Sequence, residues 1–439
     1  MTIFLWLIVT VAIIVWLTIK FQLHPFLGLL FGALFIGSVG GLAPSILMNS
    51  LADGFGATLR SIGIVIAAGA IIGEYLDRSG GAKVLANKIM ESVGEKLAPL
   101  AIGMTGYIVS IPVFCDSGFI VLSALNKAIA KRANISLAVL AVSLASGLYA
   151  THVFVPPTPG PLAAAATLGA DIGWVLILGL LVSIPVMLVA ILWATKGCSH
   201  YVINYELSEA DTLAGQTPPS FSLAILPILL PILLIALKSI VQFPSMPLGE
   251  AQLFSFFVFI GDPIIALLIG ASLSFLMVRK GKKIQHIWLE EALKKAGLII
   301  LITGAGGAFG AVLRETDLAE LASGFVDLGA FGMLIPFLIA AFLKTAQGSS
   351  TVAIITTSAI MVPLMSALGF DSSLGKALVV LVIGAGSITV SHVNDSYFWV
   401  IAKFSEMDTA TALRTHTIAS LLMGITGLLT IQILALFLL

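Results

Sequence analysis

Charged side chains are scarce in this sequence: they make up 10% of its 439 residues, whereas hydrophobic residues make up 59%. Soluble domains contain about 25% charged residues, and a soluble core could not bury so much apolar surface. The few charges balance, with 22 basic and 22 acidic side chains, and no basic block suggests a nucleic-acid partner. We therefore expect an all-α, polytopic membrane protein that is surrounded by lipid and binds no nucleic acid.

Cysteine is almost absent, and the two that occur, Cys115 and Cys198, lie in unrelated segments. This excludes a disulfide framework and gives no metal-ligand spacing. The sequence also pairs no nucleophile with a base. The glycines between Gly304 and Gly310 superficially resemble a nucleotide loop, but they follow no strand and indicate close helix packing. We expect neither an enzyme nor a bound cofactor or metal.

Long apolar runs account for most of the chain, and each crossing of a bilayer needs about 20 residues. The first run begins at Ile3 without a basic leader or a small-residue cleavage site, so we interpret it as a span and not as a signal peptide. The predicted spans are residues 3–19, 25–42, 57–76, 137–170, 174–195, 223–237, 254–278, 298–313, 374–403 and 417–438.

Two further apolar stretches, about 98–130 and 334–368, carry polar and small residues at their centres. A polar centre in an apolar run suits a re-entrant hairpin whose tip is buried in protein or faces water. If both termini are periplasmic, the spans and two hairpins place most Lys and Arg residues on the inner side. We therefore predict a bacterial inner-membrane protein with one hairpin entering from each side.

The two halves of the sequence resemble each other, because a GxxxG pair, a polar hairpin tip and a His-Val dipeptide recur in the same order. An odd number of crossings per half makes the second copy inverted, an arrangement that secondary transporters use for alternating access. Each repeat would hold one hairpin and one broken transmembrane helix. The predicted parts are residues 1–200 (hairpin 98–130, broken helix 137–170), a cytoplasmic linker at 201–221, and residues 222–439 (hairpin 334–368, broken helix 374–403).

Asp116 lies at the centre of the first hairpin. A carboxylate near the bilayer centre costs roughly 2.5–3.5 kcal/mol, so it needs a partner, water or a proton, and desolvation favours its protonated form. Asp116 is therefore a candidate proton carrier. The alternative is that it merely caps a helix beginning at Ser117.

Both hairpin tips are small and hydroxylated, and each is predicted to begin a returning half-helix. The free N–H groups and positive dipole end of such a helix bind carboxylates, and nearby hydroxyls could bind hydroxyl groups of a solute. The alternative is a tight turn that simply requires small residues. The candidate substrate ligands at the tips are Asp116, Ser117, Gly118, Gly348, Ser349, Ser350 and Thr351.

Polar residues interrupt two of the predicted spans. Four prolines between residues 156 and 161 cannot continue a helix, so backbone carbonyls must open where ligand, protein or water satisfies them. The second interruption has no proline but contains Asp395, which is either a second proton site or a cap. The candidate ligands at the interruptions are Thr151, His152, Thr158, His392 and Asn394, although a buried histidine can also be purely structural.

Two other charged residues have simpler explanations. Lys344, in the second hairpin, could neutralise an acidic solute, but we favour a side chain that snorkels to the outer surface. Glu74 lies at the end of a span and is expected to be solvated.

Four segments together resemble the gluconate permease family, within the wider ion transporter superfamily, over essentially the whole chain. They are 111–119 (IPVFCDSGF), 151–161 (THVFVPPTPGP), 347–353 (QGSSTVA) and 391–399 (SHVNDSYFW). The resemblance implies uptake of gluconate, related sugar acids or D-serine, with coupling to protons. The superfamily further implies a homodimer in which a transport domain moves like an elevator against a scaffold.

Two positions depart from the family pattern. Gluconate and D-serine permeases usually carry Glu where this chain has Asp116, and His where it has Thr158. An altered pocket makes a smaller acid such as glycerate as credible as gluconate. We therefore expect proton symport of a small hydroxy monocarboxylate, with Asp116 and Asp395 as coupling residues. An uncoupled anion channel or facilitator, and a sodium-coupled carboxylate or D-serine transporter, are the alternatives.

Overall fold

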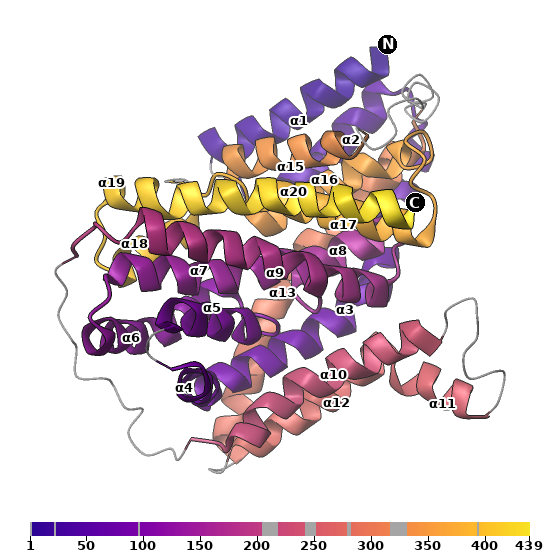
Figure 1. Ribbon diagram of the computed structural model, residues 1–439. Coiled ribbons are helices and arrows are strands. Elements are labelled where there is room, and N and C mark those ends of the chain that lie inside the picture. The colour runs from indigo at the N-terminus through magenta and orange to yellow at the C-terminus, as the bar shows by residue number, and fades with distance from the viewer. Residues whose placement is uncertain are drawn as a thin grey trace.

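The computed structural model describes residues 2–21, 23–94, 97–203, 218–241, 252–278, 282–316, 332–392 and 395–439. All regular secondary structure in these ranges is helical, as the composition predicts (Figure 1). Most of the predicted linker, residues 204–217, and the candidate ligand Asn394 lie outside the described residues.

The helices of the first half are α1 (Thr2–Lys20), α2 (Pro25–Val39), α3 (Pro44–Arg78), α4 (Gly81–Val93), α5 (Ala98–Val109), α6 (Cys115–Ala133), α7 (Leu137–Phe154), α8 (Pro159–Leu168) and α9 (Ile172–Gly197). Those of the second half are α10 (Phe221–Val241), α11 (Gln252–Ile260), α12 (Pro263–Ser274), α13 (Lys282–Arg314), α15 (Leu334–Gln347), α16 (Ser350–Met361), α17 (Ser373–Ile388), α18 (Ser396–Phe404), α19 (Thr409–Ala412) and α20 (Ile418–Leu438). A π-helical stretch, η5 (Leu413–Thr417), joins α19 to α20, and 3₁₀ turns η2 (Phe275–Met277) and η4 (Val362–Leu364) follow α12 and α16.

Apolar helices occupy the predicted spans. Within the described ranges, five helices are long and apolar enough to cross a membrane, or up to seven if two bent pairs each count as one span. The span predicted at 254–278 is bent, because α11 and α12 meet at an angle of 60°. Asp262 caps α12 by accepting a hydrogen bond from the Ile264 amide, and Pro263 occupies its first turn. Both residues favour the start of a new helix.

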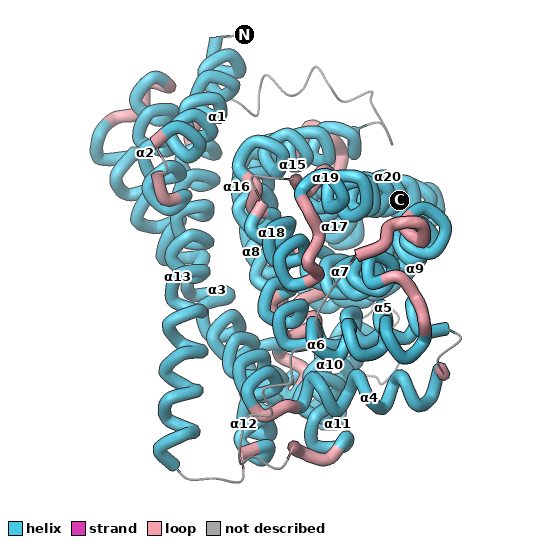
Figure 2. Tube along the Cα trace, turned by 90° about the vertical axis from the view of Figure 1, so that its left-hand side faces the viewer, coloured by secondary structure: helices cyan, strands magenta, loops and turns pink. Residues whose placement is uncertain are grey.

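The helices form two groups that meet at α8 and α16 (Figure 2). In one group α3 and α13 pack along each other, with α2 and α12 beside them; in the other, α5, α7, α9, α17 and α20 pack together. Helices α8 and α16 contact each other and both α13 and α17. On α8, Leu162 and Ala163 belong to the apolar core of the first group, whereas Ala164 and Ala165 belong to that of the second.

Each stretch predicted as a hairpin is a pair of helices that contact each other, and the chain between them is non-helical. Helices α5 and α16 contain 12 residues each, which span about 18 Å. This is shorter than the roughly 30 Å hydrocarbon core of a bilayer, so neither helix can cross alone. The chain also breaks at both predicted interruptions, between α7 and α8 and between α17 and α18.

Glu74 is buried, so the expectation of a solvated side chain is wrong. Its side chain on α3 is 2% exposed, and its carboxylate pairs with Arg78 of the same helix and, at 2.6 Å, with Lys295 of α13. Helix α13 covers this end of α3 and supplies the second cation. The ion pair between Glu74 and Lys295 thus joins α3 to α13.

Gly147 of α7 lies directly against the backbone of α5, where an added Cβ would sit 1.9 Å from the Gly103 carbonyl oxygen. Alanine there requires the two helices to move apart, so we expect Gly147→Ala to lower the free energy of unfolding by about 2–3 kcal/mol. Thermal unfolding in detergent measures this. Gly297→Ala on α13 is the control, because nothing lies within 4 Å of its added Cβ. Equal stability of the two variants would contradict a tight α5–α7 contact.

Candidate functional site

The second tip is shaped by a glycine in a left-handed conformation. Gly348 ends α15 with φ of 80°, a region that glycine enters at little cost. The next residue, Ser349, caps α16 by accepting a hydrogen bond of 3.3 Å from the Val352 amide. The Gly348 carbonyl oxygen turns inward and accepts a hydrogen bond of 2.7 Å from the ammonium of Lys344. The tip therefore presents a carbonyl, a cation and a capped helix start together.

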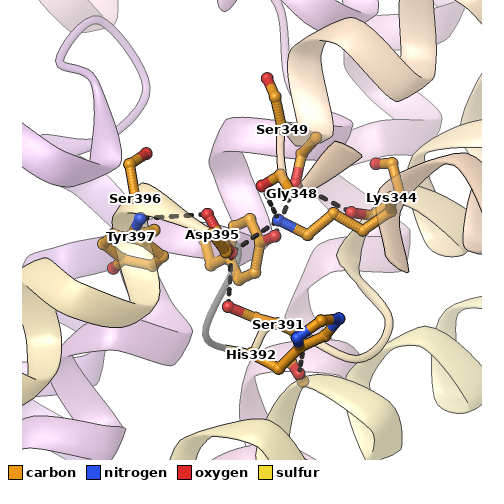
Figure 3. A network of polar contacts seen from close by, with 12 residues as sticks. Lys344, Gly348, Ser349, Ser391, His392, Asp395, Ser396 and Tyr397 are labelled. Atoms are coloured by element: carbon orange, nitrogen blue, oxygen red, sulfur yellow. Dashed lines mark hydrogen bonds and ion pairs between the residues drawn. The ribbon is translucent and has the colours of Figure 1, made fainter. Parts of the chain in front are cut away.

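Lys344 and Asp395 form an ion pair inside the protein (Figure 3). Their charged atoms are 2.6 Å apart, and their side chains are 1% and 4% exposed. The prediction that Lys344 snorkels to the outer surface is wrong. A carboxylate and a carbonyl lie within reach inside the protein, so the ammonium has two hydrogen-bond acceptors there. The pair connects the second hairpin to the second interrupted helix.

Asp395 is both a helix cap and an ion-pair partner. Its Oδ1 accepts a hydrogen bond of 3.0 Å from the Tyr397 amide at the start of α18, so the cap, one of the two roles predicted for it, is present. Its Oδ2 accepts hydrogen bonds from Lys344 and from the Ser391 hydroxyl. One short side chain thus holds a helix start, a cation and a hydroxyl, and a change in its charge affects all three.

His416 extends this network, and the sequence analysis did not find it. Its Nε2 lies 3.1 Å from Ser391 Oγ, while its Nδ1 is buried with no hydrogen-bond partner among the described residues. The ring packs against the rings of Tyr149 and Tyr397, at centroid distances of 6.3 and 5.8 Å. His416 lies in the π-helical stretch η5, and such stretches are frequent at functional sites. We call Lys344, Gly348, Asp395, Ser391 and His416 the central network.

The first tip approaches the central network from the other half of the chain. Helix α6 begins at Cys115 after Phe114, which makes no side-chain cap, so the interpretation of Asp116 as the cap is wrong. Asp116 lies instead in the first turn of α6, and Ser396 at the start of α18 donates to its Oδ2 at 3.5 Å. Asp395 and Lys344 are the nearby charges that act on it. Ser117 and Gly118 belong to the same first turn, and the Gly118 amide bonds to the Phe114 carbonyl at 2.9 Å.

The first interruption contributes less than predicted. The hydroxyls of Thr151 and Thr158 are buried and bond to backbone carbonyls of their own turns. His152 lies beside Phe114 of the first tip, with 6.2 Å between ring centroids, and its buried Nδ1 has no hydrogen-bond partner among the described residues. Only His152 of these three therefore offers a free polar atom near the tips.

Hydrogen bonds with α7 and α17 also hold the second tip in place. Tyr149 of α7 and Ser350 of α16 share a hydrogen bond, and Ser350 donates to the Ser387 carbonyl at 2.8 Å. Ser350 is thus occupied by the protein, whereas Ser349 and Thr351 are half-buried in the same turn. His392 Nε2 lies 3.1 Å from the Thr345 carbonyl oxygen. Of the predicted site residues, Asp116, Gly348, Ser349 and Asp395 lie at or beside the central network, where the last three already bond to groups of the protein.

The cap at Ser349 gives a test with a matched control. Ser349→Ala removes a cap and should cost about 1 kcal/mol of stability, measured by thermal unfolding. Ser372 caps α17 in the same way, through the Gly375 amide, but lies at an exposed helix start. We expect Ser372→Ala to cost a similar amount, while only Ser349→Ala weakens solute binding in a titration. Unchanged binding in Ser349→Ala would remove this hydroxyl from the site.

Known permeases are similar to this chain over nearly its whole length. The model of the GntP family permease matches residues 1–437. The inner membrane permease YgbN of Escherichia coli K12 is 35% identical, with 95% of each chain covered. The gluconate permease of Pseudomonas aeruginosa is 32% identical, with 98% of this chain and 97% of the relative covered. Further relatives, at 29% and 30% identity, are named as L-idonate and D-serine transporters of E. coli.

A solved structure has the same fold. MtrF of Neisseria gonorrhoeae, described as illuminating a class of antimetabolite efflux pumps, superposes with a TM-score of 0.69 over 96% of this chain and 97% of that chain. The sequence identity of 15% makes this a likeness of fold alone.

Apolar helices around a buried charged centre at helix breaks are features of a multi-pass membrane transporter. Within that class, this chain belongs to the GntP family of permeases and is not an enzyme. The resemblance to the gluconate permease family that the four segments predicted is confirmed.

Proposed function

We propose that this permease imports a small hydroxy monocarboxylate by proton symport. The solute class includes gluconate, related sugar acids and glycerate, and the names of the gluconate and L-idonate relatives support it. The observation that carries the proposal is the buried cation of the second tip, Lys344, whose charge also acts on Asp116 of the first tip. Lys344 offers a positive charge to a carboxylate, while Ser349 and Ser396 offer hydroxyls at partly open positions.

The charges of the site favour a proton as the coupling ion. Lys344, Asp395 and Asp116 together carry one positive and two negative charges when ionised. A monocarboxylate adds another negative charge, which is costly at membrane depth. Protonation of a carboxylate offsets that charge, and Asp116 is the candidate because the contacts that its carboxylate makes among the described residues, with Ser396 and Cys115, are long. Asp116 and Asp395 are the proposed proton-coupling residues, and no cofactor takes part.

The architecture of the proposed cycle is an elevator in the bacterial inner membrane. Both halves contain a long helix, a helix pair, an interrupted helix and an apolar helix in the same order. These elements are α3 to α9 in the first half and α13 to α20 in the second. The shared order supports inverted repeats at 1–200 and 222–439. The α3–α13 group would act as the scaffold, and the group containing both tips would move. We further propose that two copies form a homodimer through their scaffold helices. Both termini of each copy lie in the periplasm in this proposal.

Uptake into proteoliposomes tests this function. With an alkaline interior and no sodium gradient, gluconate or glycerate should accumulate above its external concentration. Downhill equilibration without accumulation would identify a channel or facilitator. Accumulation driven by sodium and indifferent to pH would identify a sodium-coupled carboxylate or D-serine transporter. Either result would overturn proton symport.

A further inference from the structure

Lys344 is an internal cation held by few groups. Its ammonium contacts Asp395 Oδ2 and the Gly348 carbonyl oxygen, and it lies 5.7 Å from the centroid of the Tyr149 ring. A buried charge of this kind must keep an anionic partner. An ammonium is a compact point charge, so any carboxylate of suitable size can replace another beside it.

The position of Lys344 makes such a replacement feasible. Its partner carbonyl belongs to Gly348, next to the half-buried Ser349. Asp395 lies next to the exposed Ser396, which contacts Asp116 of the other tip. A carboxylate that enters between the tips therefore reaches Lys344 where Asp395 now binds it.

The hydrogen bonds around Asp395 define the direction of a proton path. An ionised carboxylate only accepts, so Ser391 must donate its proton to Asp395 Oδ2. Ser391 Oγ then accepts from His416 Nε2, because its own proton is already used. His416 is thus assigned as the tautomer with hydrogen on Nε2, and its bare Nδ1 is the atom buried without a partner among the described residues.

We propose that Lys344 binds the carboxylate of the transported solute, and that Asp395 releases Lys344 by taking up a proton through Ser391 and His416. This inference rests on the proposed function of the same site. In the unloaded carrier Asp395 is the counter-ion of Lys344; in the loaded carrier the solute takes that place and Asp395 is neutral. Release of Lys344 is therefore obligatory for solute binding, which couples the two fluxes.

The proton transfer balances in three steps. A proton from the medium adds to His416 Nδ1, and the proton on Nε2 passes to Ser391 Oγ. The original hydroxyl proton of Ser391 passes to Asp395 Oδ2. One proton has entered, Asp395 has become a neutral acid, Ser391 is again a hydroxyl, and His416 is neutral with its hydrogen on Nδ1. Loss of the proton on the other side of the membrane reverses these steps.

The groups that face His416 are compatible with this role. Tyr149 of α7 and Tyr397 of α18 pack against its ring, and Ser391 contacts its Nε2. The charges that act on it come from Asp395 and Lys344, while Arg414 on the same stretch is exposed.

Since Asp116 takes up one proton and Asp395 a second, each monocarboxylate moves one net positive charge inward. An inside-negative potential of 59 mV should then raise steady-state accumulation by wild-type protein about tenfold.

Two assays on five variants in proteoliposomes test the inference: exchange of labelled for unlabelled solute at equal pH, and net uptake driven by a pH gradient. Asp395→Asn mimics the neutral acid, so exchange should stay within about fivefold of wild type, while net uptake falls at least about a hundredfold because the empty carrier holds an unpaired ammonium. Lys344→Met should lose both activities. His416→Gln and Ser391→Ala should slow net uptake about tenfold or more, with little change in exchange.

The double variant Lys344→Met/Asp395→Asn separates this role from a purely structural ion pair. It contains no buried charge at the pair and should fold, as checked by monodisperse elution and a cooperative melt, yet it should not exchange solute. Transport by this variant, or wild-type-like accumulation by Asp395→Asn, would overturn the inference. If steady-state accumulation by wild-type protein does not change with membrane potential, uptake of the second proton is contradicted. Failure of wild-type protein to accumulate solute under a pH gradient would instead overturn the proposed function.

Discussion

Lys344→Met should lower the free energy of unfolding by about 3–5 kcal/mol, the largest loss of stability expected from a single substitution in this permease. The methionine leaves Asp395 as a buried carboxylate that has lost its cation, and its remaining partners among the described residues are Ser391 and the Tyr397 amide. Desolvation of that charge is no longer offset. Thermal or denaturant unfolding of the purified protein in detergent measures the effect.

Two controls separate charge from packing. Lys344→Met/Asp395→Asn removes both charges and should recover most of the lost stability, since a neutral pair of similar volume replaces the ion pair. Lys238 and Asp262 form a pair at 3.0 Å with side chains 20% and 40% exposed, so Lys238→Met should cost less than about 1 kcal/mol. A loss below about 1 kcal/mol in Lys344→Met would mean that water reaches Asp395.

Asp116→Asn should reduce proton-driven accumulation about tenfold for each pH unit of the imposed gradient. The amide cannot take up a proton, so one proton fewer drives each transport cycle, and each proton contributes a factor of ten per pH unit. Asparagine has nearly the volume of aspartate, so the contact with Ser396 can persist. The ratio of internal to external solute at steady state, measured at two or more gradients, gives the slope directly.

Asp408→Asn is the matched control for this variant. Asp408 is exposed and caps α19 by accepting a hydrogen bond of 2.7 Å from the Thr411 amide, and asparagine caps a helix about as well. Accumulation by Asp408→Asn should equal that of wild-type protein. An unchanged slope in Asp116→Asn would remove Asp116 from proton coupling and leave Asp395 as the coupling residue.

Local chemistry made much of the fold predictable. Apolar runs predicted the helices, and the small residues at 348–351 marked the break between α15 and α16, since glycine and a capping hydroxyl favour the end of one helix and the start of the next. Residues 117–118 lie in the first turn of α6, just after the break between α5 and α6. The prolines after His152 marked the break between α7 and α8. The bend at Gly261, Asp262 and Pro263 had an equally clear signal, which the apolar run around it concealed.

Residues whose role depends on a distant partner could not be predicted. Lys344 meets Asp395 only because α15 packs against α17, and no local rule distinguishes that outcome from snorkelling. Glu74 was expected in water for the same reason, because its partner Lys295 lies on another helix. His416 was missed since it precedes an ordinary apolar span. Its π-helical turn, which brings it to Ser391, shows only in the folded chain.

Solute protection of two single cysteines, one at the second tip and one beside Asp116 of the first tip, tests most directly whether both tips line one solute site. In a background with Cys115→Ser and Cys198→Ala, cysteines would replace Ser349, which is half-buried beside Gly348, and Ser396, which is exposed beside Asp116. Saturating hydroxy acid should slow maleimide labelling at both positions, while a cysteine at the exposed Ser372 is labelled at an unchanged rate. Protection at neither position 349 nor position 396, or equal protection at all three positions, would contradict the account.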